Sequence, residues 1–102
     1  MADIRSGDDN LVSLKARVQG HVQGVGFRVF IRSTAWRLGV RGYVRNMPDG
    51  SMQIVANGER EALDSLLKEV WRGPAGAHVK TIDSEWQTGE LPGLASQFEV
   101  RL

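Results

Sequence analysis

The chain has 102 residues, 41% of them hydrophobic and 25% charged, which suits one domain with a single core. Thirteen Lys and Arg against 12 Asp and Glu leave a net charge of +1, which excludes a strong overall attraction to nucleic acid or to anionic membranes. The absence of cysteine excludes disulfides, thiolate metal ligands and a cysteine nucleophile. No apolar run approaches the ~20 residues of a membrane-spanning helix, so we expect no membrane partner.

The N-terminal residues 1–10 are polar and lack the apolar core of a signal peptide. We therefore expect a disordered polar tail over 1–10, a single domain over 11–102, and a cytoplasmic location, which a chain without cysteine fits. Glycine is enriched: it makes up 12 of the 102 residues, whereas an average composition has ~7% glycine. Three of these glycines fall within residues 20–26.

Hydrophobic periodicity divides the domain into strands of period two and helices of period 3.6. In chain order, it predicts a strand over 12–18, a glycine-rich loop over 20–26, a helix over 27–38 with Gly39 as its C-terminal cap, a hairpin of strands 40–46 and 51–57, a helix between Gly58 and Gly73, a strand over 78–87 and a short strand over 97–102. Val79 is out of phase with the rest of its strand, which indicates a bulge or a late start.

This order is β-α-β-β-α-β with a short last strand, which predicts an α+β fold, a ferredoxin-like two-layer sandwich. We expect a mostly antiparallel sheet with two helices on one face. In this arrangement the third strand lies between the first two, so the loop over 20–26 and Asn46 meet at one edge of the sheet. Their backbones are then two strand spacings apart, roughly 9 to 10 Å, which suits a phosphate and one water.

The loop over 20–26 (GHVQGVG) lies between a strand and a helix. Consecutive glycines let backbone N–H groups form a concave anion nest, and the free N–H groups at the start of the next helix add positive charge. Arg28 lies in the first helical turn, where the helix dipole disfavours a cation unless an anion is bound. The alternative is that the glycines only make a turn and Arg28 is a surface charge. A P-loop is excluded because no Gly-Lys-Ser/Thr follows, and Val29 stands where a dinucleotide loop has its third glycine.

Two segments resemble the signatures of the acylphosphatase family. Residues 20–28 (GHVQGVGFR) are similar to the first signature, and residues 42–46 (GYVRN), with Gly50 and Gly58, are similar to the second. Met52 departs from the family, which usually has Val at this buried strand position. The resemblance covers about residues 11–102, so only the polar tail is unmatched.

The resemblance implies hydrolysis of the carboxyl-phosphate bond of acyl phosphates to a carboxylate and inorganic phosphate, with no metal and no cofactor. By position, Arg28 would bind phosphate oxygens and Asn46 would orient the attacking water, which makes these two the expected catalytic residues. Asn46 taken alone is better explained as a turn residue before residues 47–50, and it is the matched motif that favours the catalytic role. Backbone amides would hold the phosphate at Gly20, His21, Val22, Gln23, Gly24 and Val25. The implied enzyme is a monomer, and inorganic phosphate is expected to act as product and competitive inhibitor.

Three other functions share this fold or this site. A relative of the carbamoyl-phosphate-hydrolysing domains of maturation proteins would have the same phosphate site. An RNA-binding module is disfavoured because residues 41–43 begin like the RNA-binding octamer but residues 44–46 depart from it, and because the first strand has no aromatic residue on which a base could stack. A purely structural protein would show no hydrolysis that depends on Arg28 or Asn46.

The remaining histidines, tryptophans and arginines are expected to have no catalytic role. His21 and His78 lack the neighbouring ligands of a metal site. The tryptophans are expected in the core or in half-buried packing: Trp36, Trp71 and Trp86. The other arginines near the site are expected to be solvated: Arg32, Arg37, Arg41 and Arg45.

Overall fold

The computed structural model describes residues 10–102, so nearly all of the tail predicted over 1–10 lies outside the described residues. The domain contains five strands and two helices in the predicted order. They are β1 (Leu11–His21), α1 (Phe27–Leu38), β2 (Arg41–Asn46), β3 (Met52–Glu59), α2 (Arg60–Arg72), β4 (His78–Thr88) and β5 (Glu99–Arg101).

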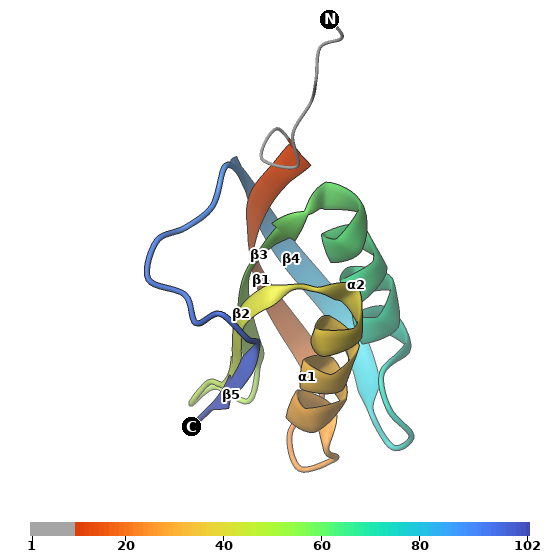
Figure 1. The fold of residues 1–102 in the computed structure, drawn as a ribbon. Helices are drawn as coiled ribbons and strands as arrows, with labels where there is room; N and C mark the ends of the chain where they lie inside the picture. The colour runs from red at the N-terminus through yellow and green to blue at the C-terminus, as the bar shows by residue number, and fades with distance from the viewer. Residues whose placement is uncertain (1–9) are drawn as a thin grey trace, which may run out of the picture.

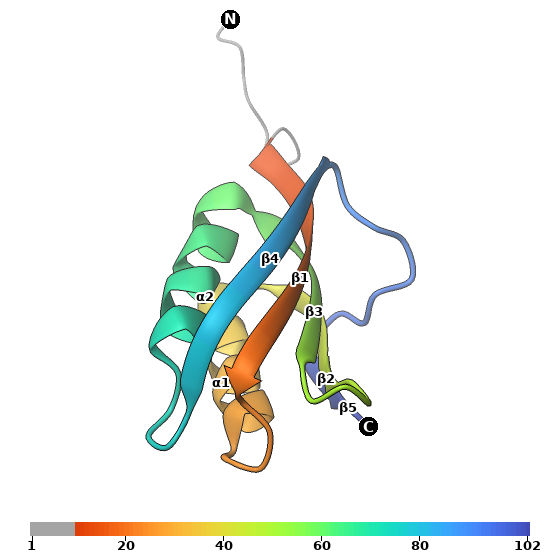
Figure 2. The ribbon, with the colours of Figure 1, turned by 180° about the vertical axis from the view of Figure 1, so that it is seen from behind.

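The strands form one sheet in the order β4-β1-β3-β2-β5. All neighbours are antiparallel except β2 and β5, which are parallel. Both helices cover the same face of the sheet, as the two opposite views show (Figures 1 and 2). The predicted ferredoxin-like sandwich is confirmed, including the position of β3 between β1 and β2.

The hydrophobic core lies between the sheet and the two helices. In β1, Leu14, Ala16 and Val18 face the helices, as the alternation predicts. In α1 the buried residues follow the spacing of one helical face, and in α2 they do the same. The buried helical residues are Phe27, Ile31, Thr34 and Ala35 in α1, and Leu63, Leu66 and Val70 in α2.

The pairing of β1 with β4 contains the irregularity that Val79 indicates. Gln19 pairs with Thr81 and Gly20 pairs with Val79, so Lys80 is an extra residue in β4. This bulge lets β1 continue to His21, three residues beyond the predicted end of the strand.

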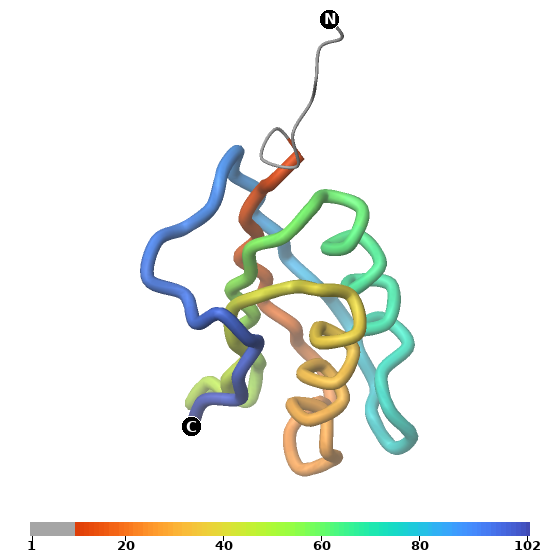
Figure 3. The backbone as a smooth tube through the Cα atoms, in the orientation of Figure 1, coloured from red at the N-terminus to blue at the C-terminus, as the bar shows by residue number. Residues whose placement is uncertain are grey.

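Residues 89–98 connect β4 at one edge of the sheet to β5 at the other, a path that is clearest in the tube view (Figure 3). The buried side chain of Asn57 holds this segment, because its Nδ2 donates to the Leu91 carbonyl at 2.8 Å and its Oδ1 accepts from the Leu91 amide at 2.9 Å. Phe98, at the end of the segment, is fully buried. These contacts bring β5 beside β2, close to the start of α1.

Neither helix within residues 10–102 is long and apolar enough to cross a membrane.

Candidate active site

The start of α1 is open to a ligand. Its N-cap is Gly26, in the left-handed conformation with φ 76°, and no side chain caps the helix. The first internal helical bond runs from the Phe30 amide to the Gly26 carbonyl at 3.1 Å, so the amides of residues 27–29 have no partner within the helix. The first turn contains no acidic residue. Gly24 also has a positive φ, 77°, which turns the preceding loop toward the helix.

A pocket of about 130 Å³ lies at this helix start. It is lined by Val22, Gly24, Gly26, Phe27, Arg28, Val29, Asn46 and Val100. The loop comes from β1, Asn46 comes from the end of β2, and Val100 comes from β5. The structure therefore brings the glycine loop and Asn46 to one site, although β3 separates their strands in the sheet.

Asn46 contributes the least satisfied polar group of this pocket. Its Oδ1 is buried and has no hydrogen-bond partner anywhere in residues 10–102. A buried acceptor without a partner costs about 1 to 3 kcal/mol, so natural proteins keep such groups mainly where a ligand, an ion or a water binds. The neighbouring hairpin turn satisfies its own backbone, since the Met47 amide donates to the Ser51 carbonyl at 2.8 Å. The Oδ1 of Asn46 thus has no part in closing that turn.

The side chain of Arg28 reaches from α1 to β5. Its Nη1 donates to the carbonyl oxygen of Arg101 at 3.2 Å, and the guanidinium forms no ion pair with any carboxylate of the described range. Its charge lies in the first turn, where it opposes the helix dipole. The position is explained if the remaining N–H groups of the guanidinium bind an anion in the pocket.

Gln23 ties the loop to the hairpin turn. Its Nε2 donates to the carbonyl oxygens of Met47 and Ser51, each at 3.0 Å. The predicted role of Gln23 was a backbone amide in the phosphate cradle, and no pattern in the sequence indicates this side-chain bridge. The bridge joins the loop to the residue that follows Asn46, so the two halves of the site are held together.

Gly20 and His21 are strand residues, which corrects the predicted loop boundary. His21 pairs with His78 in β4, and neither Gly20 nor His21 lines the pocket. Gly20 is required by close packing at the bulge, because a Cβ there would lie 2.1 Å from the carbonyl oxygen of His78. Its place in the motif therefore has a structural reason that does not involve a ligand.

Of the residues predicted for the site, Val22, Gly24, Arg28 and Asn46 line the pocket, whereas Gly20, His21, Gln23 and Val25 do not. Sequence patterns did not identify Val29 and Val100 as lining residues. Val100 is separated from the loop by about 75 residues of chain, and no local pattern links the two. Nowhere in residues 10–102 do three His, Asp or Glu side chains gather in a group that could hold a metal ion.

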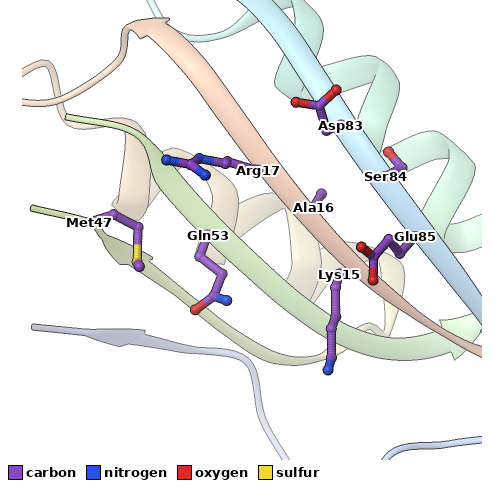
Figure 4. Close-up of a pocket in the computed structure, with 8 residues that line it drawn as sticks. All are labelled: Lys15, Ala16, Arg17, Met47, Gln53, Asp83, Ser84 and Glu85. Atoms are coloured by element: carbon purple, nitrogen blue, oxygen red, sulfur yellow. The ribbon is translucent and has the colours of Figure 1, made fainter. Parts of the chain in front are cut away.

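A larger and more open pocket, about 600 Å³, lies on the sheet face that the helices leave uncovered (Figure 4). Its charges are matched: Arg17 forms an ion pair with Asp49 and pairs with Asp83 across the strands, and Lys15 lies opposite Glu85. It has no free helix amides, and each of its two cations lies opposite a carboxylate on the neighbouring strand, so the smaller pocket is the better candidate for an anion.

The family profile of acylphosphatase matches residues 14–100. An acylphosphatase of Salinibacter ruber is 48% identical over 83 residues, which cover 81% of this chain and 85% of that protein. The structure of an acylphosphatase from Coxiella burnetii has a TM-score of 0.84 at 34% identity, and the match covers 99% of this chain and 100% of that one. HypF from T. kodakarensis has a TM-score of 0.77 at 27% identity, over 89% of this chain and 12% of that one.

The profile spans nearly the whole of the described domain, and the match to the Coxiella protein extends over complete chains. The resemblance found in the two sequence motifs is thereby confirmed. The chain belongs to the acylphosphatase family.

Proposed function

We propose that the pocket at the start of α1 is where this protein hydrolyses acyl phosphates, with Arg28 and Asn46 as its catalytic residues. The activity, cleavage of a carboxyl-phosphate bond, is that of the family to which the chain belongs. The place of the reaction and the roles of the residues are what we add. The observation that carries them is the buried, unpartnered Oδ1 of Asn46 in the same small pocket as Arg28 and the helix amides.

The phosphate binds to the backbone amides of the loop residues that line the pocket, Val22, Gly24 and Gly26, to those of the first turn of α1, and to the guanidinium of Arg28. A pocket of about 130 Å³ has room for a phosphate group and a water, whose share of liquid volume is ~30 Å³. The amide donors are fixed by the backbone before substrate arrives, so they stabilise the charge of the transition state without reorganising. Gly20 and His21, in β1, have no part in this revised cradle.

Asn46 holds the attacking water. Its Oδ1 accepts a hydrogen bond from the water, and its amide nitrogen can donate to a phosphate oxygen. The water oxygen forms a bond to phosphorus, the bond from phosphorus to the acyl oxygen breaks, and its electron pair leaves with the carboxylate. A carboxylate is a good leaving group and needs no general acid, and the product phosphate accepts the proton of the water. Positioning and charge stabilisation therefore supply the catalysis.

The first test is hydrolysis of benzoyl phosphate with a chelator present, by the wild type and by Asn46→Ala. We expect rapid hydrolysis by the wild type and a kcat lower by about 100-fold or more in the variant, because the water loses its orientation. Gln87→Ala is the control, since it removes an exposed amide in β4 that does not line the pocket. An Asn46→Ala enzyme with wild-type turnover would contradict the water-positioning role.

The same cradle should bind the product, so we propose that inorganic phosphate is a competitive inhibitor. Carbamoyl phosphate, a substrate with little beyond its phosphate, belongs in the same assay, because an enzyme that hydrolyses it would have the same phosphate site. A cytoplasmic location, which the lack of cysteine suits, and a monomeric state are also part of the proposal. Sedimentation of the purified protein tests the oligomeric state.

A further inference from the structure

A second pocket continues from the phosphate site along the groove between α1 and β5. Its volume is about 350 Å³, and Val100 lines both pockets. Arg32 and Trp36 of α1 form one side, and residues 95–100 form the other. The indole Nε1 of Trp36 donates to the Phe98 carbonyl at 2.8 Å and so fixes the far end of the groove.

Arg32 is the unexpected residue of this groove. It was expected to be solvated, but it is only partly exposed, and its guanidinium lies over the Trp36 ring at 5.0 Å from the centroid. Its Nε is buried without a hydrogen-bond partner. In the part of the chain that the structure describes, two buried side-chain polar atoms lack a partner, and the other is Oδ1 of Asn46. The two unpartnered atoms therefore belong to two adjoining pockets.

The groove carries a surplus of positive charge. Glu99, the one acidic residue that lines it, is held by Arg101 through Nη2 at 2.9 Å and Nε at 3.0 Å. Arg28 and Arg32 form no ion pair with a carboxylate of residues 10–102. An anion between α1 and β5 would thus meet two cations whose charge no neighbouring carboxylate cancels.

The geometry of in-line attack indicates which part of the substrate lies in this groove. In-line attack places the leaving oxygen opposite the attacking water. Because Asn46 holds the water at the edge where α1 begins, the acyl group leaves along α1, away from Asn46. Arg32 lies one turn further along, about 6 Å from Arg28 at 1.5 Å per residue. The phosphate pocket is too small to hold the acyl group as well, and the groove that adjoins it on the side away from Asn46 is the one beyond Val100, beside Arg32.

We propose that Arg32 is a specificity residue and that the α1–β5 groove binds a negatively charged group on the acyl portion of the substrate. The preferred substrates are then acyl phosphates whose acyl group carries a second anion, a carboxylate or a phosphate, one helical turn from the reacting phosphate. This inference rests on the proposed function of the adjoining pocket.

The test compares charged and neutral substrates of matched shape: 3- and 4-carboxybenzoyl phosphate against 3- and 4-methylbenzoyl phosphate. The rigid ring prevents the carboxylate from attacking its own acyl group. We expect the wild type to favour the better placed carboxyl substrate about 10-fold in kcat/KM, the size of one charge-assisted hydrogen bond. Arg32→Gln should abolish that preference through KM, with kcat and the methylbenzoyl substrates little changed. Arg37→Gln, which removes an exposed arginine of the same helix, is the control.

Arg32→Lys keeps the charge and should retain part of the preference, which also covers the case in which Arg32→Gln fails to fold. Equal kcat/KM for carboxyl and methyl substrates in the wild type would overturn the inference and leave the proposed function standing. An Arg32→Gln enzyme that lost activity equally on all four substrates would overturn it too, since the role would then be structural. A folded wild type that hydrolyses none of them would overturn both proposals.

Discussion

The two helices of this domain begin in opposite ways. Neither has a side-chain cap. Helix α2 follows β3 without a loop, its N-cap Glu59 is extended with φ −72°, and its first turn contains Glu61, whose charge suits the helix dipole. Helix α1 follows a glycine loop, its N-cap Gly26 is left-handed, and its first turn contains Arg28 and no acid.

The difference separates a helix start that is stable by itself from one that needs a ligand. Helix α2 also has an arginine in its first turn, but Arg60 forms an ion pair with Asp64, and the carboxylate of Glu61 offsets the positive end of the helix. At α1 the same partial charge is reinforced by Arg28, so the local electrostatic energy is unfavourable until an anion binds. A helix start whose electrostatic energy improves when an anion binds suits an enzyme that acts on a phosphate group. Both helices bury residues in the same hydrophobic core, so the contrast lies in their first turns.

The largest effect is expected for Arg28→Gln. Loss of the guanidinium should lower kcat/KM for benzoyl phosphate by about 1,000-fold, at the lower end of what a phosphate-binding arginine contributes. Inhibition by inorganic phosphate should weaken in parallel. The free energy of unfolding should stay within about 0.5 kcal/mol of the wild type, because the exposed hydrogen bond to β5 and the opposing dipole interaction are both weak.

The matched change in the other helix is Arg60→Gln, which removes the first-turn arginine of α2. Arg60 lies over the ring of Trp86, so this variant should lose some stability and keep full activity. If the two variants behaved alike in the hydrolysis assay, the distinction between the two helix starts would be wrong.

A smaller effect is expected for Gly24→Ala. Space is available for a Cβ, but φ is 77°, so the left-handed strain should lower the free energy of unfolding by about 1 kcal/mol. The shifted amides should also raise the inhibition constant of phosphate, which is read from inhibition kinetics. Gly89→Ala provides the control, with φ 81° and open space at the far end of β4. It should show the strain alone, and a rise in the inhibition constant there would count against the cradle.

The smallest effect is expected for Glu61→Lys. A cation in the first turn of α2 should reduce the free energy of unfolding by about 0.5 to 1 kcal/mol, measured by urea denaturation. High salt should shrink the difference, because it screens exposed charges. Activity should be unchanged, and a loss of activity would mean that α2 takes part in the site.

Hydrophobic periodicity was sufficient to predict the elements and their order, because each strand buries one face and each helix one stripe. It failed at Gly20 and His21, where glycine content favoured a loop although pairing with β4 extends the strand. Composition cannot reveal that a Cβ at Gly20 would collide with the backbone of another strand. The bulge in β4, by contrast, was visible in the phase of Val79.

Sequence analysis could predict the parts of the candidate site that come from the loop and the strand order. It could not predict the parts that distant segments of the chain contribute through tertiary contacts. Arg28 lies in the first turn after the loop, and strand order brings Asn46 to the same edge of the sheet. It was the resemblance to the family signatures, and not strand order alone, that singled out Asn46 in advance. The carbonyl of Arg101 and the wall formed by Val100 depend on a ten-residue segment that crosses the sheet and is held by Asn57. Hydrophobic periodicity cannot predict such a tertiary contact.

The side-chain bridge of Gln23 bears on how the enzyme tolerates thermal motion. Loops and turns at a sheet edge move on fast timescales, and independent movement of the 22–26 loop and the 47–51 turn would change the distance from phosphate to water. Two hydrogen bonds from one planar amide to Met47 and Ser51 make the two segments move as one body. When the loop and the turn move, the phosphate and the attacking water then move together. The in-line geometry of attack on phosphorus is therefore preserved during thermal motion.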